Sequence, residues 1–126
     1  MSRTRGFTLI ELLIVLVVIG ILVTVLIPRW ANSRDKAFQA AMKSDLRNLA
    51  TAQETYFYDN AMYTTSLSEL SVFHSSRGVV ITVNEATASG WSATASHPSA
   101  SKQCNLFIGN VSPVGGATME GQVVCQ

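Results

Sequence analysis

The sequence contains little of what catalytic and metal sites are made of. It has two cysteines, two histidines and eight acidic residues among 126 positions. It has no Cys-x-x-Cys pair and no Gly-x-Ser-x-Gly nucleophile motif, and no short segment carries paired carboxylates. His74 and His97 have no Cys, Asp or Glu at ligand spacing, so we expect both in solvated loops. We therefore expect no enzymatic activity, no metal site and no cofactor.

Strong charge of either sign is also missing. The net charge is +1, with neither a long basic stripe nor an acidic tail, so charge gives no indication of nucleic-acid binding. The length predicts one modest domain. The segment 12–27 has no Asp, Glu, Lys or Arg at all.

The longer apolar run that contains this segment, and that begins at Phe7, is long enough to cross a membrane. From Phe7 to Ile27 it spans about 30 Å as a helix. A secretory signal would end in a small-residue cleavage site, but Pro-Arg-Trp follows at 28–30, so we expect the segment to stay with the protein. Glu11 interrupts the run, and a carboxylate in hydrocarbon costs about 2.5–3.5 kcal/mol. It either finds a counter-charge or extends to the membrane interface.

The apolar pattern continues past Pro28 as an amphipathic helix. No Gly or Pro occurs between residues 31 and 58. One face recurs every three or four residues, at Phe38, Met42, Leu46, Leu49, Gln53 and Phe57. The pattern predicts one helix over about 7–58, apolar on all sides in its first half and amphipathic in its second. Gly20 and Pro28 are its expected weak points.

After the helix the apolar period changes to two. A mixed loop, with one short helical turn expected in 65–70, leads to four strand-like segments at 79–84, 91–96, 104–108 and 122–125. Four short strands in sequence predict an antiparallel sheet with its apolar face on the helix stripe. The predicted fold class is α+β, a long N-terminal helix packed on a four-stranded antiparallel sheet. We expect this packing to account for the aromatic residues, which are Trp30, Tyr56, Phe57, Tyr58 and Tyr63.

The two cysteines lie close together in the last quarter of the chain. Cys104 and Cys125 enclose about 20 residues, and a disulfide between them would contribute roughly 3 kcal/mol. Two free thiols are the alternative. A disulfide would place the C-terminal part outside the cytoplasm.

The segment Arg-Gly-Phe-Thr-Leu-Ile-Glu at 5–11 resembles the class III leader of the type IV pilin family and its secretion-system relatives, the pseudopilins. The resemblance covers about residues 3–30, and beyond them only the layout agrees. It implies that a prepilin peptidase cuts between Gly6 and Phe7 and that Phe7 becomes N-methylated. Glu11 matches the glutamate of the family, and Gly20 and Pro28 stand where pilins place a glycine and a proline.

The resemblance also assigns roles to the regions of the chain. Residues 1–6 are the leader, 7–28 the transmembrane and filament-core helix, and 29–58 with 59–126 the globular pilin domain. In pilins a C-terminal cysteine pair, here Cys104 and Cys125, bounds an exposed region.

Glu11 has a physical role in such a filament. Cleavage creates an amine at Phe7, and the carboxylate of one subunit can pair with the amine of its neighbour. Both charges are paired only when neighbouring subunits adopt one particular axial stagger. Gly20 and Pro28 would let the helix loosen between them, with the Thr24 hydroxyl bonding a freed backbone group.

The expected function is that of a structural subunit of an extracellular type IV pilus, used for adhesion, twitching motility or DNA uptake. Its partners are copies of itself in a helical filament, the inner membrane before assembly, the prepilin peptidase and the assembly machinery. Surface or DNA ligands are not identified by the sequence. The alternatives are a periplasmic pseudopilin of a type II secretion system, a minor pilin and a solitary membrane-anchored binding domain.

Overall fold

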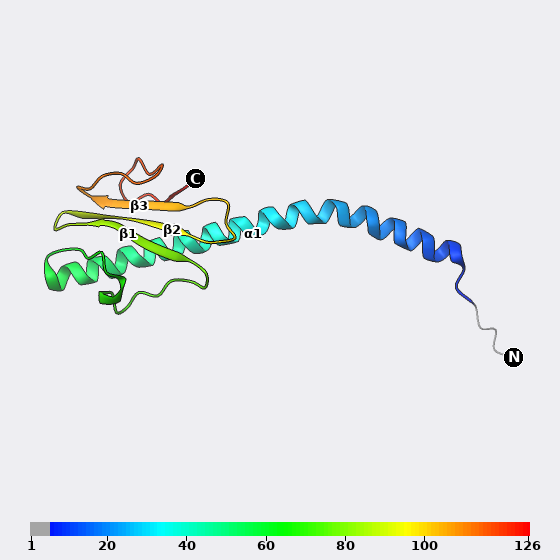
Figure 1. The fold of residues 1–126 in the computed structure, drawn as a ribbon, viewed down its shortest axis with the longest axis horizontal. Helices are drawn as coiled ribbons and strands as arrows, with labels where there is room; N and C mark the ends of the chain where they lie inside the picture. The colour runs from blue at the N-terminus through cyan, green and yellow to red at the C-terminus, as the bar shows by residue number, and fades with distance from the viewer. Residues whose placement is uncertain (1–5) are drawn as a thin grey trace. The chain divides into compact units, whose positions relative to one another are not determined.

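The computed structural model describes residues 6–126, and the fold begins with one long helix (Figure 1). Helix α1 spans Leu9–Asn60, with Pro28 inside it. A single 3-10 turn, η1, covers Leu67–Glu69, where the sequence predicted a short helical turn. Contacts within the chain divide it into two units, Met1–Arg34 and Asp35–Gln126. Residues 1–5, which make up all of the expected leader except Gly6, lie outside the described part.

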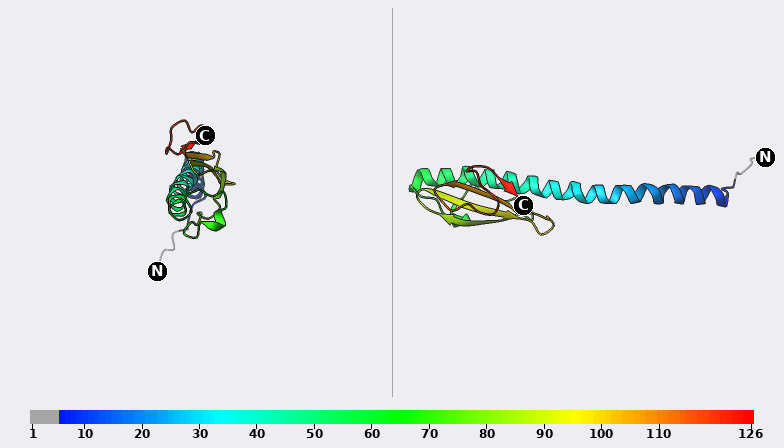
Figure 2. Two further views of the ribbon diagram at one scale, coloured as in Figure 1. Left: turned by 90° about the vertical axis from the view of Figure 1, so that its left-hand side faces the viewer. Right: turned by 90° about the horizontal axis from the view of Figure 1, so that it is seen from above.

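The second unit is a helix on a sheet. Strands β1 (Val80–Ala86), β2 (Gly90–Ser96), β3 (Cys104–Gly109) and β4 (Val124–Cys125) form one antiparallel sheet in the order β1-β2-β3-β4. Figure 2 shows this sheet alongside the C-terminal part of α1. The predicted α+β fold is confirmed, because neighbouring strands along the chain pair as a meander.

The core fills the space between the helix stripe and one face of the sheet. Met42, Leu46 and Leu49 are fully buried, as the three- and four-residue spacing predicted. They form one cluster with strand residues, among them Ile81, Trp91, Ala93, Ala95 and Leu106. Burying aliphatic and aromatic side chains of this size stabilises the fold by about 1.5–3 kcal/mol each.

The other face of the central strands is buried as well. Ser92 and Asn105 are only 1% and 5% exposed. The segment after β3 folds back on this side, where Gly121 donates its N–H to the carbonyl of Phe107 at 3.0 Å. The glycine-rich stretch suits this close approach. Gly115 has a φ of +55°, and a Cβ there would collide with the Asn105 amide.

Two expectations about single side chains are wrong. His97 is half-buried and stacks on Phe38, with ring centroids 4.0 Å apart, because the loop after β2 lies against the helix. Trp30 and Tyr58 are 72% and 89% exposed, so helix–sheet packing does not account for them. His74 is exposed, as expected.

Candidate assembly site

The N-terminus of α1 is closed by a reciprocal pair of side chains, Thr8 and Glu11. The backbone N–H and the hydroxyl of Thr8 donate to Oε2 of Glu11 at 2.9 and 2.8 Å. The Glu11 N–H donates back to the Thr8 hydroxyl at 3.3 Å. This arrangement is a capping box, which satisfies backbone N–H groups that a helix start leaves open.

The capping box gives Glu11 a role within its own subunit. From the sequence, the expected role of Glu11 was either to pair with a counter-charge or to extend to the membrane interface. The Thr-x-x-Glu spacing was visible in the sequence and is the signal that would have revealed the box. Both bonds from Thr8 use Oε2, and within residues 6–126 the other oxygen, Oε1, has no hydrogen-bond partner. An ionised carboxylate has about four acceptor positions, so capacity for a second partner remains.

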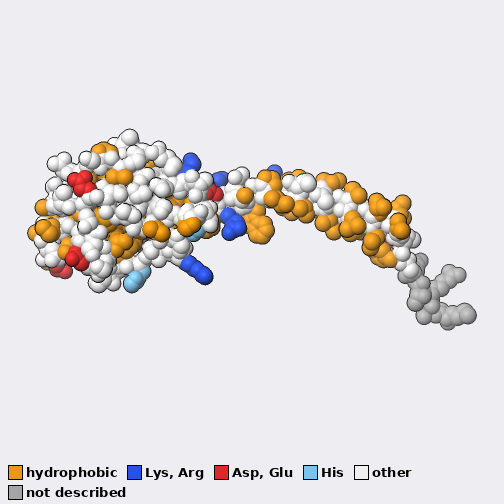
Figure 3. Space-filling view, in the orientation of Figure 1, with side chains coloured by type: hydrophobic (Ala, Val, Ile, Leu, Met, Phe, Trp, Pro, Cys, Tyr) orange, Lys and Arg blue, Asp and Glu red, His pale blue; other side chains and the backbone are white. Residues whose placement is uncertain are grey.

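The apolar segment behind this cap is exposed. Its large side chains from Phe7 to Ile27 are between 42% and 82% exposed, and Figure 3 shows them in orange along the helix. Among the described residues, α1 is the one helix long and apolar enough to cross a membrane. A patch of this extent is not stable in water and indicates a membrane or a protein partner.

Gly20 and Pro28 both lie inside continuous helix. No side chain is close to Gly20, where an added Cβ would meet nothing within 4 Å. The Thr24 hydroxyl donates to the carbonyl of Ile21 at 2.7 Å. Pro28 has no N–H to offer the carbonyl four residues earlier, so the helix has one backbone bond fewer here.

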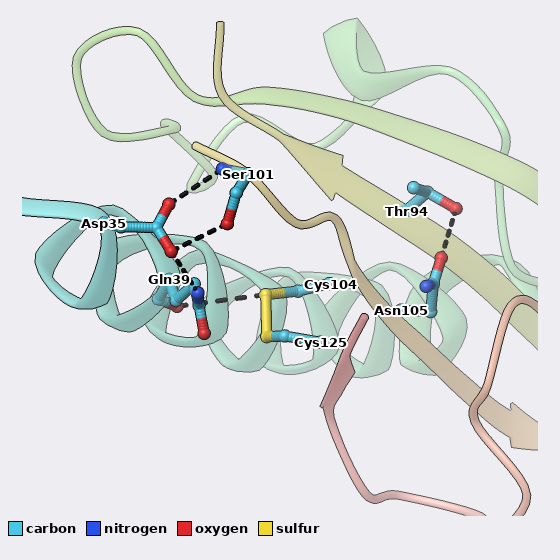
Figure 4. The surroundings of a disulfide bond; sticks show 7 residues. All are labelled: Asp35, Gln39, Thr94, Ser101, Cys104, Asn105 and Cys125. Carbon is cyan, nitrogen blue, oxygen red and sulfur yellow. Dashed lines mark hydrogen bonds between the residues drawn. A yellow bond between two sulfur atoms is a disulfide. The ribbon is translucent and has the colours of Figure 1, made fainter. Parts of the chain in front are cut away.

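A carboxylate at the start of the globular unit holds the loop between β2 and β3. Asp35 accepts hydrogen bonds from the N–H and the hydroxyl of Ser101 at 2.7 and 2.8 Å, and from the Gln39 amide at 2.8 Å (Figure 4). The bonds from Ser101 are the main reason that the pKa of Asp35 is below its ordinary value of 3.8.

Two further polar residues of α1 bind the loop that follows the helix. Asp45, 2% exposed, accepts from the N–H and hydroxyl of Ser76 at 2.7 and 2.8 Å. Gln53, fully buried, bonds both the carbonyl and the N–H of Thr64, at 2.6 and 3.1 Å. These bonds satisfy backbone groups that the helix and sheet do not reach.

The contact between Gln53 and Thr64 adjoins a small hydrogen-bond network around Glu69. The Thr64 hydroxyl donates to Glu69 at 2.5 Å, and Tyr56 donates to the same carboxylate. The bonds from Thr64 and Tyr56 lower the pKa of Glu69, because they favour the carboxylate, and the bond to Glu69 raises the pKa of Tyr56, because it favours the protonated phenol.

Cys104 and Cys125 form a disulfide between facing residues of β3 and β4, with Cα atoms 4.0 Å apart. The Cys104 sulfur lies 3.9 Å from the Gln39 carbonyl oxygen (Figure 4). A bonded sulfur carries no proton, so this approach is a packing contact. The disulfide secures the short strand β4 and the segment that covers the sheet.

The acidic residues late in the chain are dispersed. Glu120 accepts from the N–H of Gly109 at 2.8 Å, and Glu85 lies exposed on β1. Within residues 6–126 no three His, Cys, Asp or Glu side chains gather as metal ligands.

Comparison with known proteins shows which sequences this chain is similar to. The family described as "Prokaryotic N-terminal methylation motif" matches residues 1–27. The chain is 40% identical over 68 residues to type IV major pilin protein PilA of Myxococcus xanthus, covering 54% of this chain and 31% of that protein. It is 38% identical over 66 residues to type II secretion system core protein G of Klebsiella pneumoniae, covering 52% and 47%.

A longer similarity extends beyond the helix. The chain is 35% identical over 100 residues to type IV wide pilus major component PilA4 of Thermus thermophilus, covering 77% of this chain and 76% of that protein. A match of this extent, with the helix-on-sheet fold and the N-terminal motif, shows that the chain belongs to the type IV pilin family. The chain spans under half the length of PilA and of protein G.

Proposed function

We propose that the chain is a structural subunit of an extracellular type IV pilus, assembled through its N-terminal helix. The observation that carries this proposal is a long apolar helix whose side chains are exposed from Phe7 to Ile27 and whose start is capped by Glu11. Such a helix is suited first to a bilayer and then to a bundle of identical helices. No catalytic role is proposed, and the energy for extension comes from a partner ATPase.

Proteolytic maturation creates the positively charged N-terminal amine that takes part in assembly. A prepilin peptidase cuts between Gly6 and Phe7, and the new amine at Phe7 is methylated. The free Oε1 of Glu11 then receives the amine of a neighbouring subunit, while Oε2 keeps its bonds from Thr8. The cap and the intersubunit pair are therefore compatible. Pairing in a dry bundle favours one axial register, since any other leaves both charges without partners.

Gly20 and Pro28 act at a later step. The missing bond at Pro28 and the open space around Gly20 lower the cost of loosening the helix between them when subunits pack. The precursor resides in the inner membrane, and the disulfide-bonded domain faces outward to meet surfaces, DNA or other cells.

The test is to isolate the filaments that the protein forms. Sheared surface fibres from cells that produce it are identified by mass spectrometry. We expect a subunit that begins at methylated Phe7 and carries an intact Cys104–Cys125 bond. Fibres that lack the chain, or a mature product that still begins at Met1, contradict the proposal.

A second candidate is a pseudopilin of a type II secretion system, which the identity to core protein G favours. That match covers about half of the chain, whereas the match to the pilus component PilA4 includes 100 residues. Deleting the gene distinguishes the two. A pilus subunit is required for surface fibres, and a pseudopilin is required for release of secreted proteins without surface fibres.

A further inference from the structure

Trp30 is a large aromatic residue that neither unit uses for its core. It is 72% exposed, whereas the chain's other tryptophan, Trp91, is fully buried. Helix α1 begins at Leu9, and Trp30 follows that residue by 21 positions, or about 32 Å of helix at 1.5 Å per residue. The hydrocarbon core of a bilayer is about 30 Å thick. A helix with Leu9 at one surface of the bilayer therefore brings Trp30 to the opposite surface.

The indole of Trp30 continues an apolar face of the helix. Val23, Leu26, Ile27 and Trp30 together line a shallow hollow on the helix surface. Their spacing of three, four and seven residues places them on one side. The face that meets acyl chains thus ends in a side chain with both an apolar ring and an N–H donor. Tryptophan with this amphipathic character is enriched at the level of lipid headgroups.

Arg29 supplies a charge next to the indole. It is exposed, and within residues 6–126 its guanidinium has no hydrogen-bond or ion-pair partner. A guanidinium binds phosphate through paired N–H groups, and lipid phosphates lie just outside the level at which an indole rests. In water the apolar ring of Trp30 stays exposed, whereas at a lipid surface the ring is covered and the cation faces an anionic partner.

We propose that Trp30 and Arg29 form a headgroup anchor that fixes the depth of the subunit in the bilayer before assembly. The indole lies among the glycerol and carbonyl groups, and the Arg29 guanidinium binds lipid phosphate. The apolar run continues into the acyl chains through Val23, Leu26 and Ile27. This inference rests on the membrane-bound stage of the proposed function.

The depth of Trp30 is measurable in vesicles. The full chain is reconstituted in mixed phosphatidylcholine and phosphatidylglycerol, with lipids brominated either near the headgroup or deep in the acyl chain. Subtracting the emission of Trp30→Phe, which retains only buried Trp91, isolates the Trp30 signal. We expect shallow bromines to quench Trp30 more than deep bromines, and aqueous iodide to quench it less than free indole. Stronger quenching by deep bromines, or iodide quenching equal to that of free indole, overturns the anchor.

Two Arg29 variants test the phosphate contact. Arg29→Gln removes the charge, and we expect it to reduce quenching by shallow bromines, while Arg29→Lys retains most of it. Identical profiles for wild type and Arg29→Gln overturn the role of Arg29. A second copy of the chain is the competing occupant of this face. If quenching of Trp30 by brominated lipid falls as the ratio of protein to lipid rises, a second copy covers the face of Val23, Leu26, Ile27 and Trp30. That result overturns the lipid contact.

The anchor and the filament can fail separately. Cells that produce the wild type without surface fibres, with Trp30 at headgroup depth in vesicles, contradict the pilus function and support the anchor. Fibres built from a chain whose Trp30 lies deep contradict the anchor and leave the pilus function intact.

Discussion

The carboxylate of Asp35 accepts two hydrogen bonds from Ser101, a residue 66 positions later, through its N–H at 2.7 Å and its hydroxyl at 2.8 Å. This contact joins the first turn of the helix in the globular unit to the loop between β2 and β3. His97 of the same loop stacks on Phe38, one helical turn further along. The loop is therefore held at two points before β3 enters the sheet.

Asp35→Asn should lower the thermal stability of the domain, since the amide is a weaker acceptor for the Ser101 N–H and hydroxyl. The effect should depend on pH. The folded state lowers the pKa of Asp35, so the contribution of the carboxylate is fully present above the ordinary value of 3.8 and is lost as the pH falls through the lowered pKa. Melting temperatures of both proteins from pH 7 to pH 2 measure this. A difference that grows on acidification contradicts the assignment.

Gln53→Ala should destabilise the domain strongly. The amide of Gln53 is fully buried and satisfies both the N–H and the carbonyl of Thr64, which is 8% exposed. Its loss leaves two buried backbone groups unsatisfied, at about 1–3 kcal/mol for each. Denaturant unfolding of the full chain in detergent micelles gives the free energy of unfolding. The matched control is the exposed Gln122→Ala, with an expected change within about 0.5 kcal/mol. Equal effects of the two substitutions would disprove the role of Gln53.

The disulfide should contribute about 3 kcal/mol to the free energy of unfolding, because it closes a loop of 21 residues in the unfolded chain. Replacing both Cys104 and Cys125 with serine should reproduce the effect of a reductant on the wild type. Unfolding curves with and without reductant test this, and the double variant should not respond to reductant. A response of the double variant would show that the reductant acts elsewhere.

The main elements were predictable because each depends on a local pattern. The spacing of Met42, Leu46 and Leu49 gave the helix stripe, and the period-two segments gave the strands, so the helix was expected at 7–58 and is observed at Leu9–Asn60. The contacts of Asp35 and Asp45 were not predictable. Asp35 bonds Ser101, which is 66 residues later, and Asp45 bonds Ser76, which is 31 residues later, so both contacts depend on the path of a distant loop. Neither serine stands in a sequence pattern that indicates a partner.

Only part of the site at the N-terminus was predicted from the sequence. The leader motif indicated Gly6, Phe7 and Glu11, whereas the bond between Thr8 and Glu11 within the subunit was not predicted. Gln53 was assigned to the stripe by its spacing, and its bonds to Thr64 follow only from the path of the loop.

Thr8→Val should weaken the start of the helix. It removes the hydroxyl that donates to Glu11 and accepts from the Glu11 N–H. Losing such a cap costs about 0.5–2 kcal/mol, so the amide of Glu11 should exchange its hydrogen several-fold faster in micelles. Thr8→Ser retains the hydroxyl and should exchange at the wild-type rate. Equal exchange in the valine and serine variants contradicts the capping role.

Glu11→Val is the substitution that separates a filament subunit from a solitary membrane-anchored domain. In a solitary domain the change should have no effect on location or abundance, and it even relieves the cost of a carboxylate in hydrocarbon. In a filament it removes the partner of the Phe7 amine and with it the preference for one register. We expect the variant to be processed and to remain in the membrane while surface fibres are lost.

Glu11→Gln makes this test sharper. Its amide oxygen can still accept from the Thr8 N–H and hydroxyl, so the cap persists while the charge is gone. If the charge pair sets the register, Glu11→Gln should lose fibres almost as completely as Glu11→Val. If the cap alone matters, Glu11→Gln should assemble and Thr8→Val should not. Counting fibres per cell by electron microscopy, with membrane levels of each variant measured by immunoblot, decides between these outcomes. Normal fibres from Glu11→Val would contradict both roles, because that variant retains neither the charge nor the cap.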